Sequence, residues 1–195
     1  MKSVLISIRP KWCGLIASGK KTIELRKSRP KLETPFKCYI YCTLPKYPYE
    51  DFIPFNIGTE NFKAIYGGGK VIGEFVCDDI DEVSVFYDTL YCVNDTQPKK
   101  YTQMCLTLDE VRKYLGEKNH GYTWHISDLK IYDTPKELNK FYLYCGENPK
   151  CRSCEYLYIE YSENDGVYEQ CCCNIEGHKP IKRPPQSWMY VEDLE

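Results

Sequence analysis

The chain begins with a strand, a helix and a second strand within residues 4–27, and this order restricts the fold more than any other feature of the sequence. Residues 4–8 form a short β-branched run that predicts a strand. Pro10 suits the first position of a helix, and Gly19 suits the residue that ends it. The apolar residues between them fall on one helical face: Trp12, Leu15 and Ile16.

Residues 22–27 alternate with period two, which predicts a half-buried strand. Thr22, Glu24 and Arg26 share one face of it, and Ile23 and Leu25 share the other. The rest of the chain is rich in strands, with predicted strands at 38–44, 70–85, 124–132 and 188–191. Thr107 and Glu110 form a capping box that opens a helix ending at Gly116. Three prolines and a triple glycine make residues 45–69 a predicted loop.

This pattern predicts an α+β fold, a small mixed β-barrel with flanking short helices, in a single domain that spans residues 1–195. The hydrophobic content of 43% and the charged content of 28% exclude a disordered chain. No apolar run is long enough to span a bilayer, and no signal peptide is visible. We therefore expect a cytoplasmic protein without a membrane partner.

The net charge of −2 conceals a strong asymmetry along the chain. Residues 1–46 carry eleven Lys/Arg and two acids, a net charge of +9, whereas residues 47–195 carry fifteen Lys/Arg and twenty-six acids, a net charge of −11. One interpretation is an ordinary solvated basic face. The other is a basic groove in an acidic body, where acidic walls suppress loose binding of polyanions and one site still attracts them.

The strongest cluster of ionisable residues follows the predicted helix. Lys21 precedes the strand that places Glu24 and Arg26 on one face, so the three side chains converge. Arginine supplies a planar fork of donors, glutamate accepts from exocyclic amines, and lysine supplies a mobile charge, so the cluster can hold an anion or a polar ring. An ordinary ion pair with a solvated lysine is the alternative.

The pattern Gly-x-Lys-x-x-Glu-x-Arg, formed by Gly19, Lys21, Glu24 and Arg26, resembles the hallmark motif of ASCH domains in the PUA-like superfamily. The flanking segments agree over residues 1–143 and 180–195, and they include Arg9-Pro10-Lys11-Trp12, Arg29-Pro30, Trp124-His125 and Ser187-Trp188. The resemblance implies a small β-barrel with a cleft in which the motif residues face RNA or a modified nucleobase. The expected binding residues are Lys21, Glu24, Arg26, Arg9, Lys11, Arg29, Trp124, His125, Ser187 and Trp188.

The resemblance also implies an enzymatic alternative. Some small ASCH members are similar to amidohydrolases of acylated cytidine, in which the motif lysine works with a threonine and a glutamate, and others are linked to RNA cleavage. Here Glu24 occupies the position of that threonine, and Thr22 lies nearby on the same strand face. A hydrolase would therefore use Lys21, Glu24 and Thr22 as its catalytic residues.

A third possible class of function is a protein-interaction module whose acidic surface binds a partner.

Half of the twelve cysteines lie between residues 145 and 173. Cys151 and Cys154 have the two-residue spacing that lets both thiolates reach one tetrahedral zinc ion. A Cys-rich insertion at 145–178 is thus predicted to bind structural Zn²⁺ around a small hairpin, with ligands drawn from Cys145, Cys151, Cys154, Cys171, Cys173 and His178. Disulfides and a cluster of reduced thiols are the alternatives, and the missing secretion signal counts against the former. The other six cysteines are expected in the core.

Overall fold

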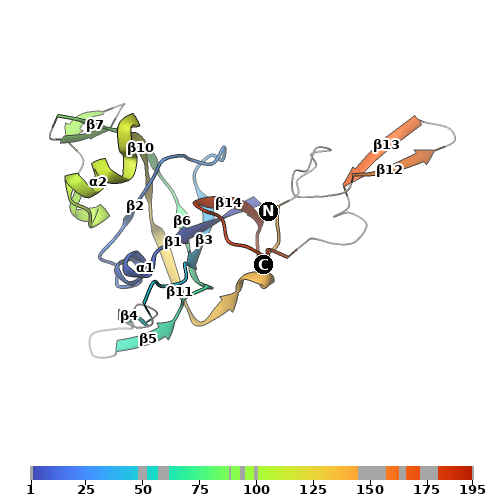
Figure 1. Ribbon diagram of the computed structural model, residues 1–195, viewed down its shortest axis with the longest axis horizontal. Coiled ribbons are helices and arrows are strands. Elements are labelled where there is room, and N and C mark those ends of the chain that lie inside the picture. Colours follow the sequence, from blue (N-terminus) through green and yellow to red (C-terminus); the bar gives the residue numbers. More distant parts are fainter. Residues whose placement is uncertain are drawn as a thin grey trace.

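The computed structural model describes residues 2–47, 52–56, 62–87, 89–92, 95–98, 101–144, 157–162, 166–171 and 180–194. Over these residues the chain is a mixed α+β structure, in which strands dominate and helices are few and short (Figure 1). The α+β class predicted from the sequence is confirmed. No helix in the described part of the chain is long and apolar enough to cross a bilayer.

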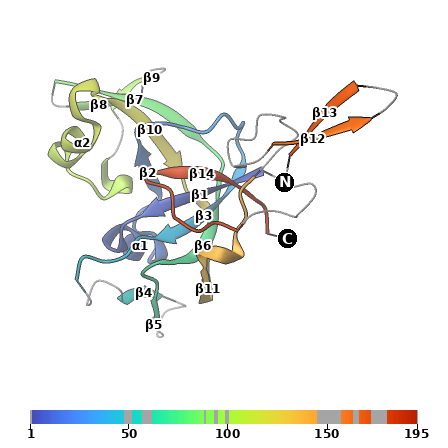
Figure 2. The same cartoon turned by 45° about the vertical axis from the view of Figure 1, so that its right-hand side comes forward.

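The first sheet has five strands in the order β11-β6-β3-β1-β14. Its strands are β11 (Ser127–Glu137), β6 (Lys70–Cys77), β3 (Phe36–Cys42), β1 (Lys2–Ile8) and β14 (Trp188–Glu192). The pair β1 and β3 is parallel, and every other pair in this sheet is antiparallel. Figure 2 shows β1, β3 and β6 running side by side at the centre of the molecule.

The second sheet also has five strands, in the order β2-β10-β7-β8-β9, and all its pairs are antiparallel. Its strands are β2 (Ile23–Arg26), β10 (His120–His125), β7 (Ile80–Phe86), β8 (Thr89–Cys92) and β9 (Asp95–Pro98). The hydrogen bonds thus define two separate sheets.

The two sheets meet at a corner that two strand pairs cross together. β6 leads directly into β7, and β10 leads directly into β11, so an antiparallel ribbon passes from one sheet to the other. Backbone hydrogen bonds tie the corner, from Ile126 N to Thr22 O at 2.9 Å and from His125 N to Asp79 O at 2.9 Å. The start of β2 is therefore fixed against the bend.

The two helices begin and end where the sequence signals predict. Helix α1 (Pro10–Ala17) has proline in its first turn, and Gly19 follows it with φ of +72°, a conformation that favours glycine. Helix α2 (Leu108–Leu115) opens with the predicted capping box, in which Thr107 N donates to Glu110 at 2.8 Å and Glu110 N donates to the Thr107 hydroxyl at 3.2 Å.

The face of α1 that packs inward differs from the predicted one. Cys13, Ile16 and Ala17 are buried, whereas Trp12 and Leu15 are only partly buried. Trp12 packs against the edge of the core and keeps part of its indole exposed. The buried face of the helix therefore lies about one residue away from the predicted one.

Apolar packing covers both faces of each of these two sheets. Between the two sheets, Ile6 and Ile40 pack with Trp124 of β10 and with Cys13 of α1. On the other side of the first sheet, Leu5, Tyr39 and Phe141 form a second cluster. A third cluster joins Leu25 and Val83 to Val111 and Leu115, and it fixes α2 against the second sheet.

The prediction for residues 45–69 is wrong in part, because this segment contains strands β4 (Phe52–Asn56) and β5 (Phe62–Tyr66). They pair antiparallel in a sheet of two strands, where both are edge strands and Pro54 is tolerated. Ile53 and Ile65 are buried in the core between the sheets. The prolines thus led to the prediction of a loop where a short two-stranded ribbon covers the core.

The predicted small hairpin in the Cys-rich segment is present as β12 (Leu157–Ser162) and β13 (Gly166–Cys171), which pair antiparallel. The rest of the insertion lies outside the described residues, with Cys145, Cys151, Cys154, Cys173, His178 and the side chain of Cys171. Zinc binding by these residues stays a prediction. The other six cysteines are free thiols, and all but Cys105 are buried.

Candidate functional site

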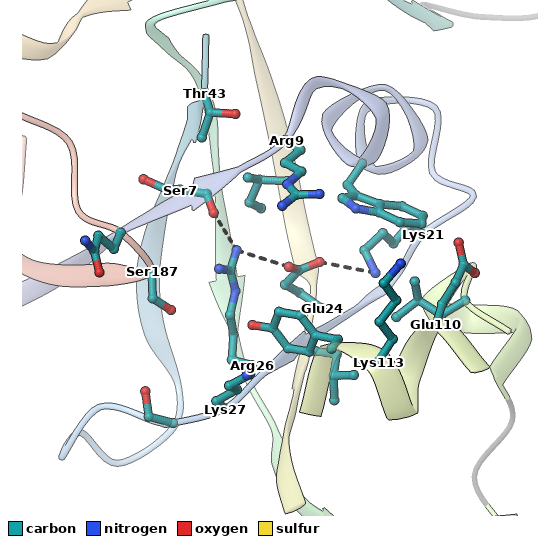
Figure 3. A pocket seen from close by; sticks show the side chains of 17 residues that line it. Ser7, Arg9, Lys21, Glu24, Arg26, Lys27, Thr43, Glu110, Lys113 and Ser187 are labelled. Carbon is teal, nitrogen blue, oxygen red and sulfur yellow. Dashed lines mark hydrogen bonds and ion pairs between the residues drawn. The ribbon is translucent and has the colours of Figure 1, made fainter. Parts of the chain in front are cut away.

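A pocket of about 820 Å³ lies where the end of β1, the start of α1, strand β2 and helix α2 come together. Residues from all four elements line it, together with Thr43 after β3 and Gln186 and Ser187 before β14. Figure 3 shows side chains from these elements facing one hollow. Four segments that lie apart in the sequence, together with Thr43, therefore build one site.

Lys21, Glu24 and Arg26 form a buried ion-pair cluster in the wall of this pocket. The Lys21 ammonium lies 3.2 Å from one Glu24 oxygen, and the Arg26 guanidinium lies 3.1 Å from the other. Their exposed fractions are 2%, 7% and 6%. The structure brings the three together as the motif spacing predicts, and the dashed contacts in Figure 3 trace the chain of interactions.

The ammonium of Lys21 is fixed rather than mobile, which corrects the sequence-based expectation. Besides Glu24, it donates to Ile23 O at 2.8 Å and to Met104 O at 2.7 Å. These three acceptors match the three donors of a lysine ammonium. Lys21 is thus committed to tying the start of β2 to the segment before α2.

Arg26 joins the second sheet to the first. Its Nη2 donates to Ser7 O at 2.7 Å as well as to Glu24, so it bridges β2 and the end of β1. Its Nε is buried and has no hydrogen-bond partner among the described residues. A buried donor without a partner is uncommon in folded proteins, and here it belongs to a residue of the pocket wall.

The ionisable residues that line the pocket are five basic and two acidic: Arg9, Lys21, Arg26, Lys27 and Lys113, and Glu24 and Glu110. Glu24 is paired with two cations, and Glu110 holds the capping box and lies 3.8 Å from Lys11. The hydrogen bond from the Thr107 backbone is the main cause that lowers the pKa of Glu110. Both carboxylates are therefore already engaged.

Three of the basic residues lie free at the mouth of the pocket. Arg9, Lys27 and Lys113 are exposed, and none has an acidic partner within 4.0 Å in the part of the chain that the structure describes. Figure 3 shows Arg9 approaching from the start of α1 and Lys113 from α2. The free positive charge points to an anionic ligand.

Two aromatic side chains, Trp12 and Tyr114, also line the pocket. The Trp12 ring lies 5.3 Å from the Lys21 ammonium and 4.3 Å from that of Lys11. The Tyr114 ring lies 5.5 Å from the Lys27 ammonium, and burial raises the pKa of its hydroxyl against the opposing effect of Arg26. Both rings are partly exposed, so each offers a surface for stacking.

No protein-family model and no curated protein matches the sequence. Among solved structures, the chain is similar to the crystal structure of ASCH from Zymomonas mobilis, at 19% identity and a TM-score of 0.53 over 97% of this chain and 87% of that one. A serine-to-alanine mutant of that protein matches at 16% identity and a TM-score of 0.52, over 97% and 88% of the two chains. This chain has an ASCH-like fold.

The ASCH-like fold confirms the resemblance that the motif and its flanks predicted. At these identities the likeness establishes the fold alone. Of the predicted binding residues, five line the pocket: Arg9, Lys21, Glu24, Arg26 and Ser187.

The other predicted residues lie elsewhere. Trp124 is fully buried between the sheets, 5.9 Å from the ring of Phe36, so it is a core residue and cannot stack on a ligand. His125 is partly exposed, and its Nδ1 lies 2.6 Å from Asp78 rather than in the pocket. Strand β10 is paired on both sides within the second sheet. Successive side chains of a strand point to opposite faces of the sheet, so Trp124 enters the core and His125 points away from it.

Four further predictions also fall outside the lining. Thr22 precedes β2 instead of alternating within it, so it does not share the pocket face with Glu24. Trp188 donates its indole N–H to the Ser28 hydroxyl at 3.1 Å. Lys11 projects beside Glu110, and Arg29 lines a neighbouring pocket.

Sequence reasoning missed the contribution of α2. Glu110, Lys113 and Tyr114 have the i, i+3 and i+4 spacing that places them on one helical face, while Val111 and Leu115 pack into the core. That polar face of α2 was the signal in the sequence that could have pointed to these lining residues. Nothing in the sequence indicated that it would meet β2, which lies far away along the chain.

Proposed function

We propose that this protein binds RNA through the pocket between β2 and α2, which holds one nucleotide, ordinary or modified. The observation that carries the proposal is the group of free cations at the pocket, Arg9, Lys27 and Lys113, beside the exposed parts of Trp12 and Tyr114. A positively charged groove with aromatic stacking surfaces is the combination by which proteins hold single-stranded nucleic acids.

The charge distribution supports an RNA backbone as the anion. The five basic residues that line the pocket exceed its two acidic ones, although the whole chain has a net charge of −2. Phosphate contacts of this kind supply most of the affinity for nucleic acids, and they depend on salt. An acidic body around a basic pocket disfavours loose binding elsewhere on the surface.

The buried cluster gives the pocket a rigid wall with hydrogen-bonding capacity. Each oxygen of Glu24 has one cation partner and retains a lone pair that can accept from the exocyclic amine of a base. The unpartnered Nε belongs to Arg26 in the same wall. We assign Lys21 the task of holding this wall, while Arg9, Lys27 and Lys113 contact phosphate.

The test is fluorescence anisotropy with a labelled single-stranded RNA at moderate salt. Replacing Arg9 and Lys113 together by alanine is expected to weaken binding at least tenfold, because a hydrogen bond to a charged group contributes about 1.5–3 kcal/mol. The matched control is Lys140→Ala, an exposed lysine that does not line the pocket. Unchanged affinity in the double variant, or an equal loss in the control, contradicts the proposal.

The hydrolase alternative uses the same pocket, with Lys21, Glu24 and Thr22 as catalytic groups. It is less well supported, because all three donors of Lys21 are engaged and Thr22 does not line the pocket. Incubation of the protein with acylated cytidine and with RNA separates the two functions. A product that disappears in Lys21→Met favours the enzyme, whereas unchanged substrates that remain bound favour a binding protein.

We also propose that the two sheets form the two halves of a PUA-like barrel within one domain. The ribbon that crosses from β6 and β11 into β7 and β10, and the shared core between the sheets, support this arrangement. The cytoplasmic location expected from the sequence stays a prediction.

A further inference from the structure

A second pocket of about 660 Å³ adjoins the first one. Lys27 and Ser28 line both pockets, so the two share part of their wall. The second pocket continues along the segment that follows β2, with Arg29, and Tyr122 from β10 also lines it. Neither the motif nor the structural neighbours assign it a role.

The same two structural elements form the walls of both pockets. Along α2, Lys113 and Tyr114 line the first pocket, whereas Leu115 and the 3-10 turn at Gly116–Lys118 line the second. Opposite the helix, the chain passes from Arg26 in the first pocket to Arg29 in the second. The wall contributed by α2 is therefore continuous, and Lys27 stands at the junction, 5.5 Å from the ring of Tyr114.

The second pocket also carries unpaired positive charge. Arg29 and Lys118 are exposed and have no ion-pair partner within the described ranges. The guanidinium of Arg29 is oriented by the carbonyl of Leu32, which accepts from Nη2 at 3.3 Å. His120 is engaged with Glu82 at 2.7 Å, so it is not counted among the free cations.

An aromatic ring accompanies these cations, as it does in the first pocket. Tyr122 is partly exposed, and its ring packs edge-to-face against His120 with 5.2 Å between the centroids. Each pocket therefore combines free cations with a partly exposed aromatic surface. This repetition is what successive nucleotides of one strand require, since each brings a phosphate and a base.

We infer that the two pockets are adjacent subsites for one continuous strand of single-stranded RNA several nucleotides long, which passes from Arg9 over Lys27 and Ser28 to Lys118. The inference rests on the proposed function and specifies its substrate class. A lone nucleoside fills only the first subsite. A strand fills both, and the phosphate between its nucleotides lies against Lys27, the cation that the two subsites share.

The experiment compares two ligand lengths on three proteins. Anisotropy titrations use a labelled nucleoside monophosphate, which can fill only one subsite, and a labelled RNA of about ten nucleotides, which is within the range of known single-strand sites. The variants are Arg29→Ala/Lys118→Ala in the second pocket and Lys140→Ala as the control. Both altered residues of the double variant are exposed, and circular dichroism spectra establish that each variant is folded.

The wild-type protein is expected to bind the longer RNA at least tenfold more tightly than the mononucleotide. The double variant is expected to lose this gain and to keep its affinity for the mononucleotide. For the longer RNA, the slope of log K against log salt should be about 1.4 less steep in the double variant than in the wild-type protein. The variant lacks two cations, and each phosphate contact on a single strand contributes about 0.7 to this slope.

The failures of the two proposals are distinguishable. Equal affinity of the wild-type protein for both lengths, or an equal loss for both in the double variant, overturns the two-subsite inference and leaves RNA binding by the first pocket intact. Failure of the wild-type protein to bind either ligand overturns the proposed function itself. A loss for the longer RNA in Lys140→Ala equal to that in the double variant also overturns the inference, because the effect is then one of overall charge.

Discussion

The Glu24 carboxylate lies 3.2 Å from the Lys21 ammonium, and both side chains are buried in the wall of the pocket. Arg26 holds the other oxygen of Glu24 and the end of β1. One carboxylate thus fixes two cations from different positions of the chain, and it links the start of β2 to the first sheet.

Replacing Glu24 by glutamine leaves two buried cations without their anion. We expect a loss of about 3–5 kcal/mol in the free energy of unfolding, because removing one partner of a buried pair exposes the desolvation cost of the other. Urea denaturation monitored by tryptophan fluorescence measures it.

The control for this variant is Glu137→Gln. Glu137 pairs with Lys70 at 3.0 Å, but both side chains are substantially exposed, and such a pair contributes at most about 1 kcal/mol. Equal losses in the two variants would show that the Lys21–Glu24–Arg26 cluster contributes no more than a surface ion pair.

The convergence of Lys21, Glu24 and Arg26 was predictable from the sequence. Glu24 and Arg26 share a strand face at period two, and Lys21 follows the turn after α1, so short-range rules suffice to bring them together. The same rules predicted both helix boundaries, because a proline at the first turn, a capping box and a terminal glycine are local signals.

Long-range contacts were not predictable. Lys113 reaches the pocket only because Val111 and Leu115 pack α2 against β2, a contact that no local pattern encodes. Trp124 was misjudged for the same reason, since its burial depends on β10 lying between β2 and β7. The fixed state of Lys21 depends on Met104, whose carbonyl comes from a distant segment.

Trp12 is expected to stack on a base. Trp12→Ala should weaken RNA binding by about 1–3 kcal/mol, the usual contribution of one stacked base. Trp12→Phe keeps an aromatic face and should retain most of the affinity. If the alanine variant binds RNA as tightly as the wild-type protein in the same anisotropy assay, the pocket does not hold a base against Trp12.

Asp193 near the end of the chain predicts a dependence of stability on pH. Burial alone would raise its pKa, but hydrogen bonds from Lys37 and Tyr39 outweigh burial and lower it. A carboxyl with a lowered pKa stabilises the fold above its unfolded value of about 3.9, and this contribution is lost as the pH falls through the folded value.

Asp193→Asn should therefore be less stable than the wild-type protein at neutral pH, and the difference should shrink below about pH 4. Denaturation midpoints in urea at several pH values measure it. Asp128→Asn is the control, since Asp128 is exposed and asparagine tolerates its φ of +46°. A difference between wild type and Asp193→Asn that does not change with pH would contradict the assignment.

Zinc binding by the Cys-rich insertion is tested by elemental analysis of protein purified without chelator. About one equivalent of zinc is expected, because an insertion this small needs a metal to hold its structure. Cys151→Ser/Cys154→Ser should abolish it, whereas Cys105→Ser, outside the insertion, should not. Protein that is free of metal would refute the prediction.

The most direct measurement of the central claim uses the three tryptophan indoles as probes in ¹H–¹⁵N NMR spectra. Trp12 lines the pocket, and Trp124 is buried between the sheets. Trp188 does not line the pocket, although its indole donates to Ser28, which does. Addition of single-stranded RNA is predicted to shift the Trp12 indole signal most and to leave that of Trp124 nearly unchanged. RNA that binds without moving the Trp12 signal would contradict the placement of the ligand in this pocket.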